Sequence, residues 1–293
     1  MVLKAIRGDV KARVIIALLA VYIFWSSTYL AIRVALKDFP PFFMMGVRFL
    51  AAGTGLYIFL RIKGAGAPDR SQWLNATLIG GLLLLGGGGG VAYAEQWIGS
   101  GLAALLIATV PLWTVIFSAI WAHRPTRLEW SGLITGLAGV AVLNLEADLK
   151  ANPLGAIVLM ISAVSWSFGS VWSRRISLPS GMMASAAEMI TGGVLVLAVS
   201  LLAGEKMSGI PTWHSMAAVL YLAVFGSLVG FIAYMYLLDK VRPSLATSYA
   251  YVNPVIAVIL GVWLAGEQIA VPGITAMFII LAGVVMVILG QRK

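Results

Sequence analysis

The stretch LLLLGGGGGVAYAEQW, residues 82–97, places five consecutive glycines directly after four leucines. In a water-soluble protein, a run such as Gly86–Gly90 is typical of a flexible linker. The composition argues for a different setting, because 61% of the 293 residues are hydrophobic and only 11% are charged. Soluble domains have about 45–50% apolar and about 25% charged residues. We therefore expect the glycine run to lie inside a membrane.

Apolar segments long enough to cross a bilayer recur along the whole chain, whose mean hydropathy is +0.98. A transmembrane helix needs about 20 apolar residues. Ten segments are candidates, of which the fifth is short at 16 residues: 14–32, 41–60, 74–93, 101–121, 130–145, 154–172, 182–202, 216–237, 245–264 and 272–290. The first has no clear small-residue cleavage site, so we interpret it as a retained helix and not as a signal peptide. The sequence predicts an all-α integral membrane protein.

The basic residues predict how these helices are oriented. If the N-terminus is cytoplasmic, fifteen of the 20 Lys and Arg residues fall in cytoplasmic segments, and only Arg33, Lys37, Lys150 and Lys206 fall outside. An excess of Lys and Arg marks cytoplasmic loops. Both termini are therefore expected in the cytoplasm, and the net charge of +9 indicates topology and not nucleic-acid binding.

The two halves of the chain resemble each other at a nearly constant spacing. Equivalent residues lie 140 to 143 positions apart: Trp25 and Trp166, Pro111 and Pro254, and the glycine pairs Gly86–Gly90 and Gly226–Gly230. This pattern predicts two units, residues 1–147 and 148–293, with five helices each. Because five is odd, the second unit is inverted in the membrane, and inverted repeats are typical of transporters.

The repeat gives the glycines a purpose. Gly86 and Gly90 form a G-x-x-x-G pattern, as do Gly226 and Gly230, and small residues at this spacing let two helices approach closely in lipid. No G-K-[ST] sequence occurs, so the run is not a phosphate-binding loop. Tight packing is the simpler hypothesis. Bending of this glycine-rich helix during a conformational cycle is the alternative.

Four segments carry a resemblance to a known family: FWSSTYLAIRVAL (24–36), PPFFMMGVRFLAAG (40–53), SLATSYAYVNPVIAVILGVWLAGEQIAVPG (244–273) and LAGVVMVIL (281–289). From about residue 14 to 290 the chain resembles the EamA branch of the drug/metabolite transporter (DMT) superfamily, and its tryptophans are similar to those of YddG-type amino-acid exporters of bacteria. The resemblance implies a multi-pass inner-membrane transporter that exports small amphiphilic metabolites such as amino acids. Arg124 replaces a glutamate usual in the family, so Glu267 has no counterpart. We expect Glu267 to have a structural role that closes the outer end of the ninth helix.

Transporters of this design bind their substrate near the midplane, where the repeats meet. The candidate cavity residues are Trp25, Ser26, Tyr29, Tyr93, Trp166, Glu188, Tyr234, Tyr251 and Asn253. Trp25 and Trp166 either line the cavity or pack between helices. Indole rings suit an apolar or aromatic substrate and attract a cationic amine. Pro111 and Pro254 each remove a backbone hydrogen bond, which gives either a static kink or a flexible joint.

Two ionisable residues lie well inside the predicted helices. Such residues face a cavity or a partner, since charge is costly in the bilayer. Arg48 matches a family motif, and we expect it to tie helix ends together. Glu188 is the functional candidate, for gripping a substrate amine or for carrying a proton. The two could pair only if the helices at 41–60 and 182–202 are neighbours.

Enzyme chemistry has little support in the sequence. The chain has no Cys, no H-E-x-x-H and no G-x-S-x-G motif, and its two histidines, His123 and His214, fall in predicted loops. We expect no cofactor and no metal. A channel and a membrane-embedded enzyme stay as alternatives to a transporter. The expected partners are a small-molecule substrate and the lipid bilayer, and the expected state is a monomer.

Overall fold

The computed structural model describes residues 2–121, 126–143, 145, 152–207, 209–241, 246–247 and 249–290. Every regular element in these ranges is helical. Arg124, His123 and Lys150, which the sequence analysis singled out, lie outside the described residues.

The chain begins with one continuous helical rod. It consists of α1 (Val2–Ala20), a π-helical turn η1 (Val21–Trp25) and α2 (Ser26–Ala35). The next helix, α3 (Pro41–Ile62), starts at a proline in its first turn. Proline is suited to this position because its fixed φ matches a helix and the N–H it lacks would have no helical partner there.

The glycine run is helical and is not a linker. α4 (Arg70–Gly80), η2 (Gly81–Gly89) and α5 (Gly90–Ala94) form a single rod, in which η2 is a wider π-helical segment. A capping box between Asp69 and Gln72 fixes its start. In lipid the backbone has no water to bond, so it stays in helical hydrogen bonding even through five glycines.

The two repeated prolines behave differently. α6 (Ser100–Ile107) and α7 (Val110–Trp121) are separated by a turn at residues 108–109, just before Pro111. Pro254 lies inside the continuous helix α15 (Tyr249–Ala265). The break is held by side chains, since Thr109 donates to the Leu106 carbonyl and Ser167 donates to the Val110 carbonyl at 3.0 Å.

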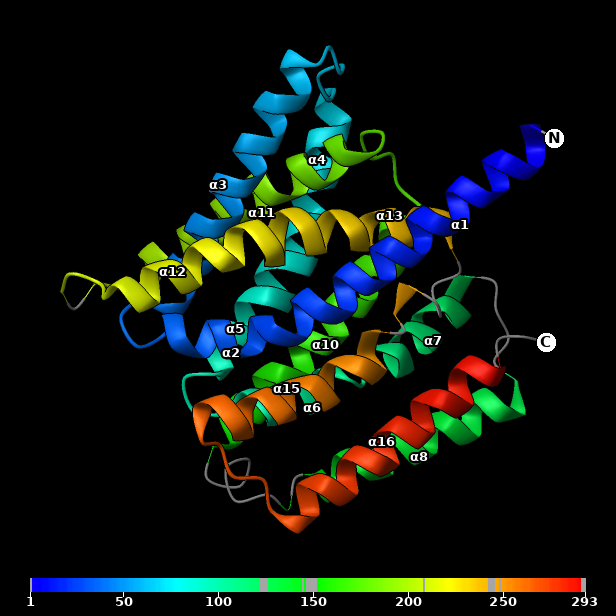
Figure 1. Cartoon of the computed structure of the whole chain (residues 1–293), viewed down its shortest axis with the longest axis vertical. Coiled ribbons are helices and arrows are strands. Elements are labelled where there is room, and N and C mark those ends of the chain that lie inside the picture. Colours follow the sequence, from blue (N-terminus) through cyan, green and yellow to red (C-terminus); the bar gives the residue numbers. More distant parts are fainter. Residues whose placement is uncertain are drawn as a thin grey trace.

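The other described helices complete an all-helical bundle. They are α8 (Arg127–Leu143), α10 (Pro153–Ser173), α11 (Met182–Leu202), α12 (Trp213–Tyr221), η3 (Leu222–Phe231), α13 (Ile232–Lys240) and α16 (Val271–Gly290). α12, η3 and α13 form one rod, and η3 begins 141 residues after η2. α1 begins and α16 ends on the same side of the bundle (Figure 1).

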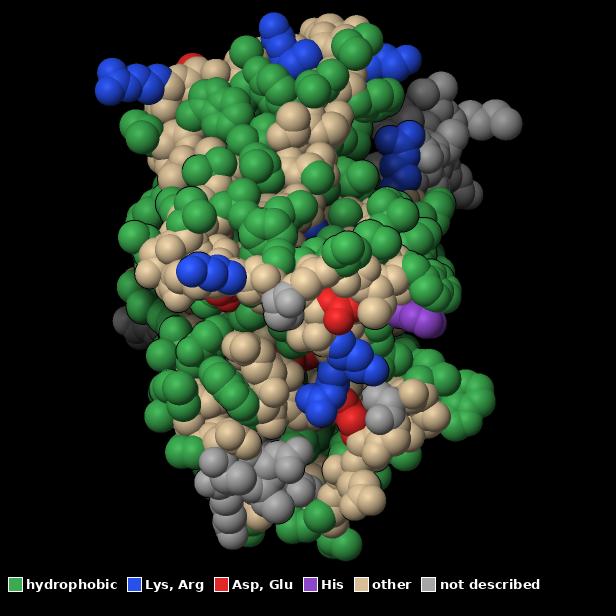
Figure 2. Space-filling view, turned by 90° about the vertical axis from the view of Figure 1, so that its left-hand side faces the viewer, with side chains coloured by type: hydrophobic (Ala, Val, Ile, Leu, Met, Phe, Trp, Pro, Cys, Tyr) green, Lys and Arg blue, Asp and Glu red, His purple; other side chains and the backbone are tan. Residues whose placement is uncertain are grey.

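The outside of the bundle is apolar enough for lipid. In the described part of the chain, seven helical rods are long and apolar enough to cross a membrane, and two shorter apolar helices lie at Val252–Leu264 and Val271–Gly283. Large side chains such as Leu202, Trp263 and Val271 are exposed. Hydrophobic side chains are spread over the face in Figure 2, and charged side chains gather near its middle and at its upper end. The chain is a multi-pass membrane protein.

Two pairs of helices pack side by side along their length, α3 with α11 and α8 with α16 (Figure 1). Glycines make both contacts possible. A Cβ on Gly193 would lie 2.7 Å from the backbone nitrogen of Leu50, and a Cβ on Gly283 would lie 2.5 Å from that of Gly136. Real Cβ atoms do not approach backbone this closely, so these positions require glycine.

Candidate functional site

A small cavity of about 90 Å³ lies in the middle of the bundle. Helices from both halves of the chain line it, including α2, α3, α10, η3 and α15. The lining residues are Trp25, Thr28, Tyr29, Ile32, Met45, Arg48, Phe49, Leu84, Gly87, Gly88, Val91, Ile107, Ser162, Trp166, Gly226, Phe231, Tyr249 and Asn253. A cavity of this size holds several waters or a small solute group.

Aromatic rings form one wall of this cavity. The Trp25 and Trp166 rings meet edge to face with centroids 5.3 Å apart, and Trp25 also meets Tyr249 edge to face at 5.1 Å. Phe231 stands 6.5 Å from Trp166. The indole N–H of Trp25 donates to the Gly226 carbonyl at 3.0 Å, which fixes the ring against η3. The wall is therefore rigid, and it offers ring faces and edges to an apolar solute.

Tyr234 supports this wall from behind. It is fully buried and does not line the cavity. Its hydroxyl accepts the Trp166 indole N–H at 3.1 Å and lies 2.8 Å from the Ser170 hydroxyl. The tertiary packing therefore assigns Tyr234 to positioning Trp166, because two bulky rings from different helices already occupy the cavity side.

Asn253 and Ser26 are arranged like Trp166 and Tyr234, with one residue at the cavity and the other behind it. Asn253 lines the cavity, while Ser26 is fully buried beside it. The Ser26 hydroxyl is 3.0 Å from the Asn253 side-chain oxygen and also bonds the Tyr22 carbonyl. This bond joins the first rod to α15. The side chain of Tyr251, another candidate, lies outside the described part of the chain.

Tyr93 lies away from the cavity. Its ring stacks on Phe42 at 5.3 Å and meets Trp97 edge to face at 5.1 Å. These contacts place it at the end of α5, next to the start of α3. The helical repeat places Tyr93 on the side of the rod that faces Phe42. Val91 and Gly88 of the same rod lie on the side that faces the cavity.

The glycine pairs lie against the partner half. A Cβ on Gly86 or Gly90 would come within 2.2 Å of the hydroxyl of Ser165 or Ser162, both on α10. A Cβ on Gly226 or Gly230 would meet Thr28 or Trp25 of the first rod, at 3.0 and 2.3 Å. Each G-x-x-x-G face thus receives the polar and aromatic stripe of the first helix of the other half.

Glu188 is fully buried, and neither carboxyl oxygen has a hydrogen-bond partner. It does not line the central cavity. One turn before it, Ser185 lines a wide groove of about 1260 Å³ that Arg13 of α1 and Lys240 of α13 also border. Residue 188 itself does not line this groove.

Arg48 does not pair with Glu188, although α3 and α11 are neighbours. Among described contacts, the Arg48 Nε donates to the Ser227 hydroxyl at 3.1 Å, and Nη1 contacts the Met45 sulfur at 3.5 Å. The helical period explains this, since Gly46 and Gly53 face α11 and residue 48 points away from them, towards η3.

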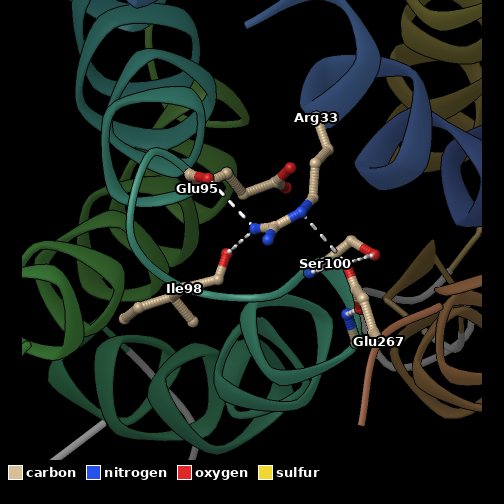
Figure 3. Close-up of polar contacts among 6 residues, drawn as sticks. Arg33, Glu95, Ile98, Ser100 and Glu267 are labelled. Atoms are coloured by element: carbon tan, nitrogen blue, oxygen red, sulfur yellow. Dashed lines mark hydrogen bonds and ion pairs between the residues drawn. The ribbon is translucent and has the colours of Figure 1, made fainter. Parts of the chain in front are cut away.

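A charged cluster lies at the end of α2, where Arg33 directly follows the cavity-lining Ile32 (Figure 3). The Arg33 Nε lies 3.4 Å from the Glu267 carboxylate, and its Nη1 donates to the carbonyls of Glu95 and Ile98. Glu267 also accepts the Ser100 N–H and hydroxyl at 2.8 Å each. These contacts join α2, the turn before α6 and the turn after α15.

The Glu267 carboxylate caps α6, while the Glu267 backbone N–H donates to the Gly261 carbonyl of α15 at 3.0 Å, so the residue also closes its own helix. Its carboxylate receives the N–H groups of Ser100 and Gly101, the first residues of α6. The reason is the turn at Gly266, whose φ of +66° leads the chain away from α15 and towards the neighbouring helix start. A carboxylate at a helix N-terminus is favourable, because the N–H groups there lack helical partners.

Glu95 is a residue that the sequence analysis missed. It is 1% exposed, and both carboxyl oxygens lack a hydrogen-bond partner. Burial raises the pKa of the Glu95 carboxyl well above its usual range; the nearby Glu267 charge raises it further, and Arg33 opposes this. An acidic residue directly after an apolar helix was the available signal, but its nearness to Glu267 arises only from folding.

In the described part of the chain, no three His, Cys, Asp or Glu side chains are close enough together to hold a metal ion. Among the described residues that line the cavity, Arg48 is the one that is charged, and the others are aromatic, aliphatic or small and polar. Such a site can bind a small solute.

The chain matches the model of the EamA-like transporter family twice, over residues 12–145 and 153–289. It is 49% identical to the inner membrane transporter YedA of Escherichia coli (strain K12), over 94% of this chain and 90% of YedA. It is 24% identical to the transporter YoaV of Bacillus subtilis (strain 168), over 94% of this chain and 96% of YoaV. It is 26% identical to the protein PagO of Salmonella typhimurium, over 96% of this chain and 95% of PagO.

A solved crystal structure has the same fold, with a TM-score of 0.70 and 22% identity over 96% of this chain and 99% of that one. The two family matches together cover most of the sequence. The chain belongs to the EamA-like transporter family of the drug/metabolite transporter superfamily and is a multi-pass transporter of the inner membrane.

Proposed function

We propose that this protein is a secondary transporter that exports small amphiphilic metabolites, foremost neutral and aromatic amino acids, by alternating access. The observation that carries the proposal is the central cavity, which both halves line and which Trp25 and Trp166 wall with edge-to-face rings. An aromatic wall binds apolar side chains and attracts an amine.

The packing supports ten membrane-spanning helices in two inverted repeats. In each half the second helix contacts its counterpart (α3 with α11), as does the fifth (α8 with α16). The third helix of each half, with its π-helical glycine segment, packs against the first helix of the other half. Two halves related by a two-fold axis in the membrane plane must make such equivalent contacts with each other.

Glu188 is proposed as the group that takes up a proton or a substrate amine. Its carboxyl is buried without a described hydrogen-bond partner, and Ser185, one turn earlier on α11, lines the groove between α1, α11 and α13. By the positive-inside rule these helix ends face the cytoplasm. An unpartnered carboxyl inside a membrane protein is a functional candidate by its cost alone.

The decisive experiment is uptake into liposomes that contain the purified protein, with a panel of labelled amino acids and with or without a pH gradient. Saturable, protein-dependent uptake supports a transporter. Flux that does not saturate supports a channel, and a product that differs from the added solute supports an enzyme. Uptake that fails for every amino acid would exclude the proposed substrate class.

Topology is tested separately with reporter fusions. Reporters at Arg70, at residue 123 and at the C-terminus should report the cytoplasm, and reporters at residue 150 and at Lys206 should report the periplasm. A reversal at any one of these positions contradicts the inverted repeat. The monomeric state we expect is checked by light scattering of the protein in detergent.

A further inference from the structure

Arg48 is a buried cation that has no counter-ion among the described residues. Its side chain is 6% exposed and borders the central cavity. Within the described residues no carboxylate lies within ion-pair distance of it. Its contacts are the Ser227 hydroxyl, the Met45 sulfur and the Phe49 ring, whose centroid is 4.7 Å from the guanidinium carbon.

These contacts leave most of the guanidinium unsatisfied. The group has five N–H donors, and a thioether sulfur is a weak acceptor. Nε is satisfied by Ser227, whereas Nη2 has no described hydrogen bond. Nη2 is not fully buried, and Arg48 borders the cavity, so this donor is accessible from the cavity.

The space beside Nη2 depends on a glycine. A Cβ on Gly226 would lie 3.1 Å from Nη2 and 3.0 Å from the Thr28 methyl group. Any larger residue would press on the guanidinium from η3. The wall of the cavity therefore carries a guanidinium with unused N–H donors, and the glycine at 226 leaves space beside them.

A purely structural role of Arg48 does not explain the unused donors or the missing counter-ion among the described residues. If Arg48 only tied α3 to η3, its single good hydrogen bond to Ser227 would be enough, and a neutral side chain could make it. A charge in a poorly solvated place needs an opposite charge, and one is missing among the described residues. A bound anion would supply it.

We propose that Arg48 binds the carboxylate of the transported solute, and that the solute's apolar part lies against Trp25, Trp166 and Tyr249. The inference rests on the proposed transport function and names the group that recognises the substrate. A guanidinium binds a carboxylate with two parallel N–H bonds, through donors such as Nη1 and Nη2. Arg48 is the one cation among the described lining residues, so the site suits a single negative charge.

The test uses the full-length protein in liposomes and three matched probes. Phenylalanine has both a carboxylate and an amine, phenylalanine amide has only the amine, and 3-phenylpropionate has only the carboxylate. The wild-type protein should transport the two carboxylates. It should take up the amide with a half-saturating concentration about 10- to 100-fold higher, the usual effect of losing a charge-assisted hydrogen bond.

Variants separate binding from structure. Arg48→Met should raise the half-saturating concentration for phenylalanine to that of the amide, while the melting temperature stays the same or rises. Arg48→Lys keeps the charge and loses the planar guanidinium, so its half-saturating concentration for phenylalanine should lie between those of the wild type and Arg48→Met. Ser227→Ala removes the tie between the helices and should have a smaller effect on phenylalanine. Arg61→Met, at the far end of α3, is the matched control.

Equal transport of phenylalanine and its amide by the wild-type protein overturns the inference even if Arg48→Met does not fold. So does an Arg48→Met protein that still prefers phenylalanine over its amide. If the protein carries amines and none of the carboxylates, the transport function survives and the carboxylate anchor does not. If it carries no solute of any kind, both fail.

Discussion

Two arginines on consecutive helices are used in opposite ways. Arg33, at the end of α2, reaches the Glu267 carboxylate at 3.4 Å and two backbone carbonyls, and its side chain is 38% exposed. Arg48, inside α3, is almost completely buried and has no carboxylate near it among the described residues. The more accessible charge is fully paired, whereas the charge that needs a partner most has an open cavity beside it.

The carboxylates repeat this contrast. Glu267 accepts three hydrogen bonds from the first two residues of α6, while Glu188 accepts none in the described structure. Paired charges hold helix ends together, so removing one should cost stability. Unpaired charges are costly to the fold, so removing one should cost function and leave stability unchanged or improved.

The largest expected effect is that of Glu188→Gln. If the carboxyl carries a proton or grips an amine, transport should fall at least about tenfold and its pH dependence should flatten. The melting temperature in detergent should not fall, since no described hydrogen bond is lost. Both are measured on one preparation, by liposome uptake across a pH series and by thermal unfolding.

Glu205→Gln is the matched control for that prediction, because Glu205 accepts the N–H groups of Phe42 and Phe43 at the start of α3. It should lower stability and leave the shape of the pH profile intact. Full transport by Glu188→Gln with an unchanged pH profile would remove the distinction between paired and unpaired charges.

The second effect is on stability at the Arg33 cluster. Glu267→Gln should destabilise the protein by about 2–3 kcal/mol, because it removes an ion pair and weakens the cap of α6. Arg33→Gln should cost less, since its side chain is partly solvated. The affinity for solute should change little, because neither residue lines the cavity. Thermal unfolding of the single and double variants gives the coupling, and additive effects would refute a shared ion pair.

A smaller effect is expected at the aromatic wall. Trp25→Ala and Trp166→Ala should each weaken solute affinity a few-fold, by about 0.5–1.5 kcal/mol, through loss of ring contact. Trp263→Ala is the control, because that side chain is 80% exposed on the outside of the bundle. Uptake kinetics measure all three. Normal uptake by both wall variants would place the solute elsewhere.

The smallest effect is a pH slope set by Glu95. Its pKa is raised in the folded protein by burial and by Glu267. At low pH both the folded and the unfolded forms hold the proton, so the folded state has no penalty. As the pH rises above the usual carboxylate value, only the unfolded form ionises readily, and stability falls until the raised pKa is passed. Glu95→Gln should abolish this part of the slope in melting temperature against pH, and an unchanged slope would assign it to another group.

Much of the fold was predictable because lipid simplifies the rules. The apolar segments predicted helices that the structure contains, and most bounds are shifted by only a few residues. The first helix, however, begins at Val2 and not at residue 14, and the segment 101–121 is broken at residues 108–109. The site was less predictable. Trp25, Tyr29, Trp166 and Asn253 do line the cavity, whereas Ser26, Tyr93, Glu188 and Tyr234 do not. A helical stripe tells which face a residue shares, and it does not tell how far a neighbouring side chain already fills the space.

The sequence by itself determined that the chain is an all-helical membrane protein of the EamA-like family, because hydropathy and motif order depend only on local residue type. Tertiary structure alone decided which charges found partners. Glu267 and Arg33 are 234 positions apart in the sequence, and their contact exists only because the turn after α15 meets the end of α2. Arg48 has no carboxylate partner in the described structure for the same physical reason. Electrostatic pairing depends on distance in space, and that distance is set by packing.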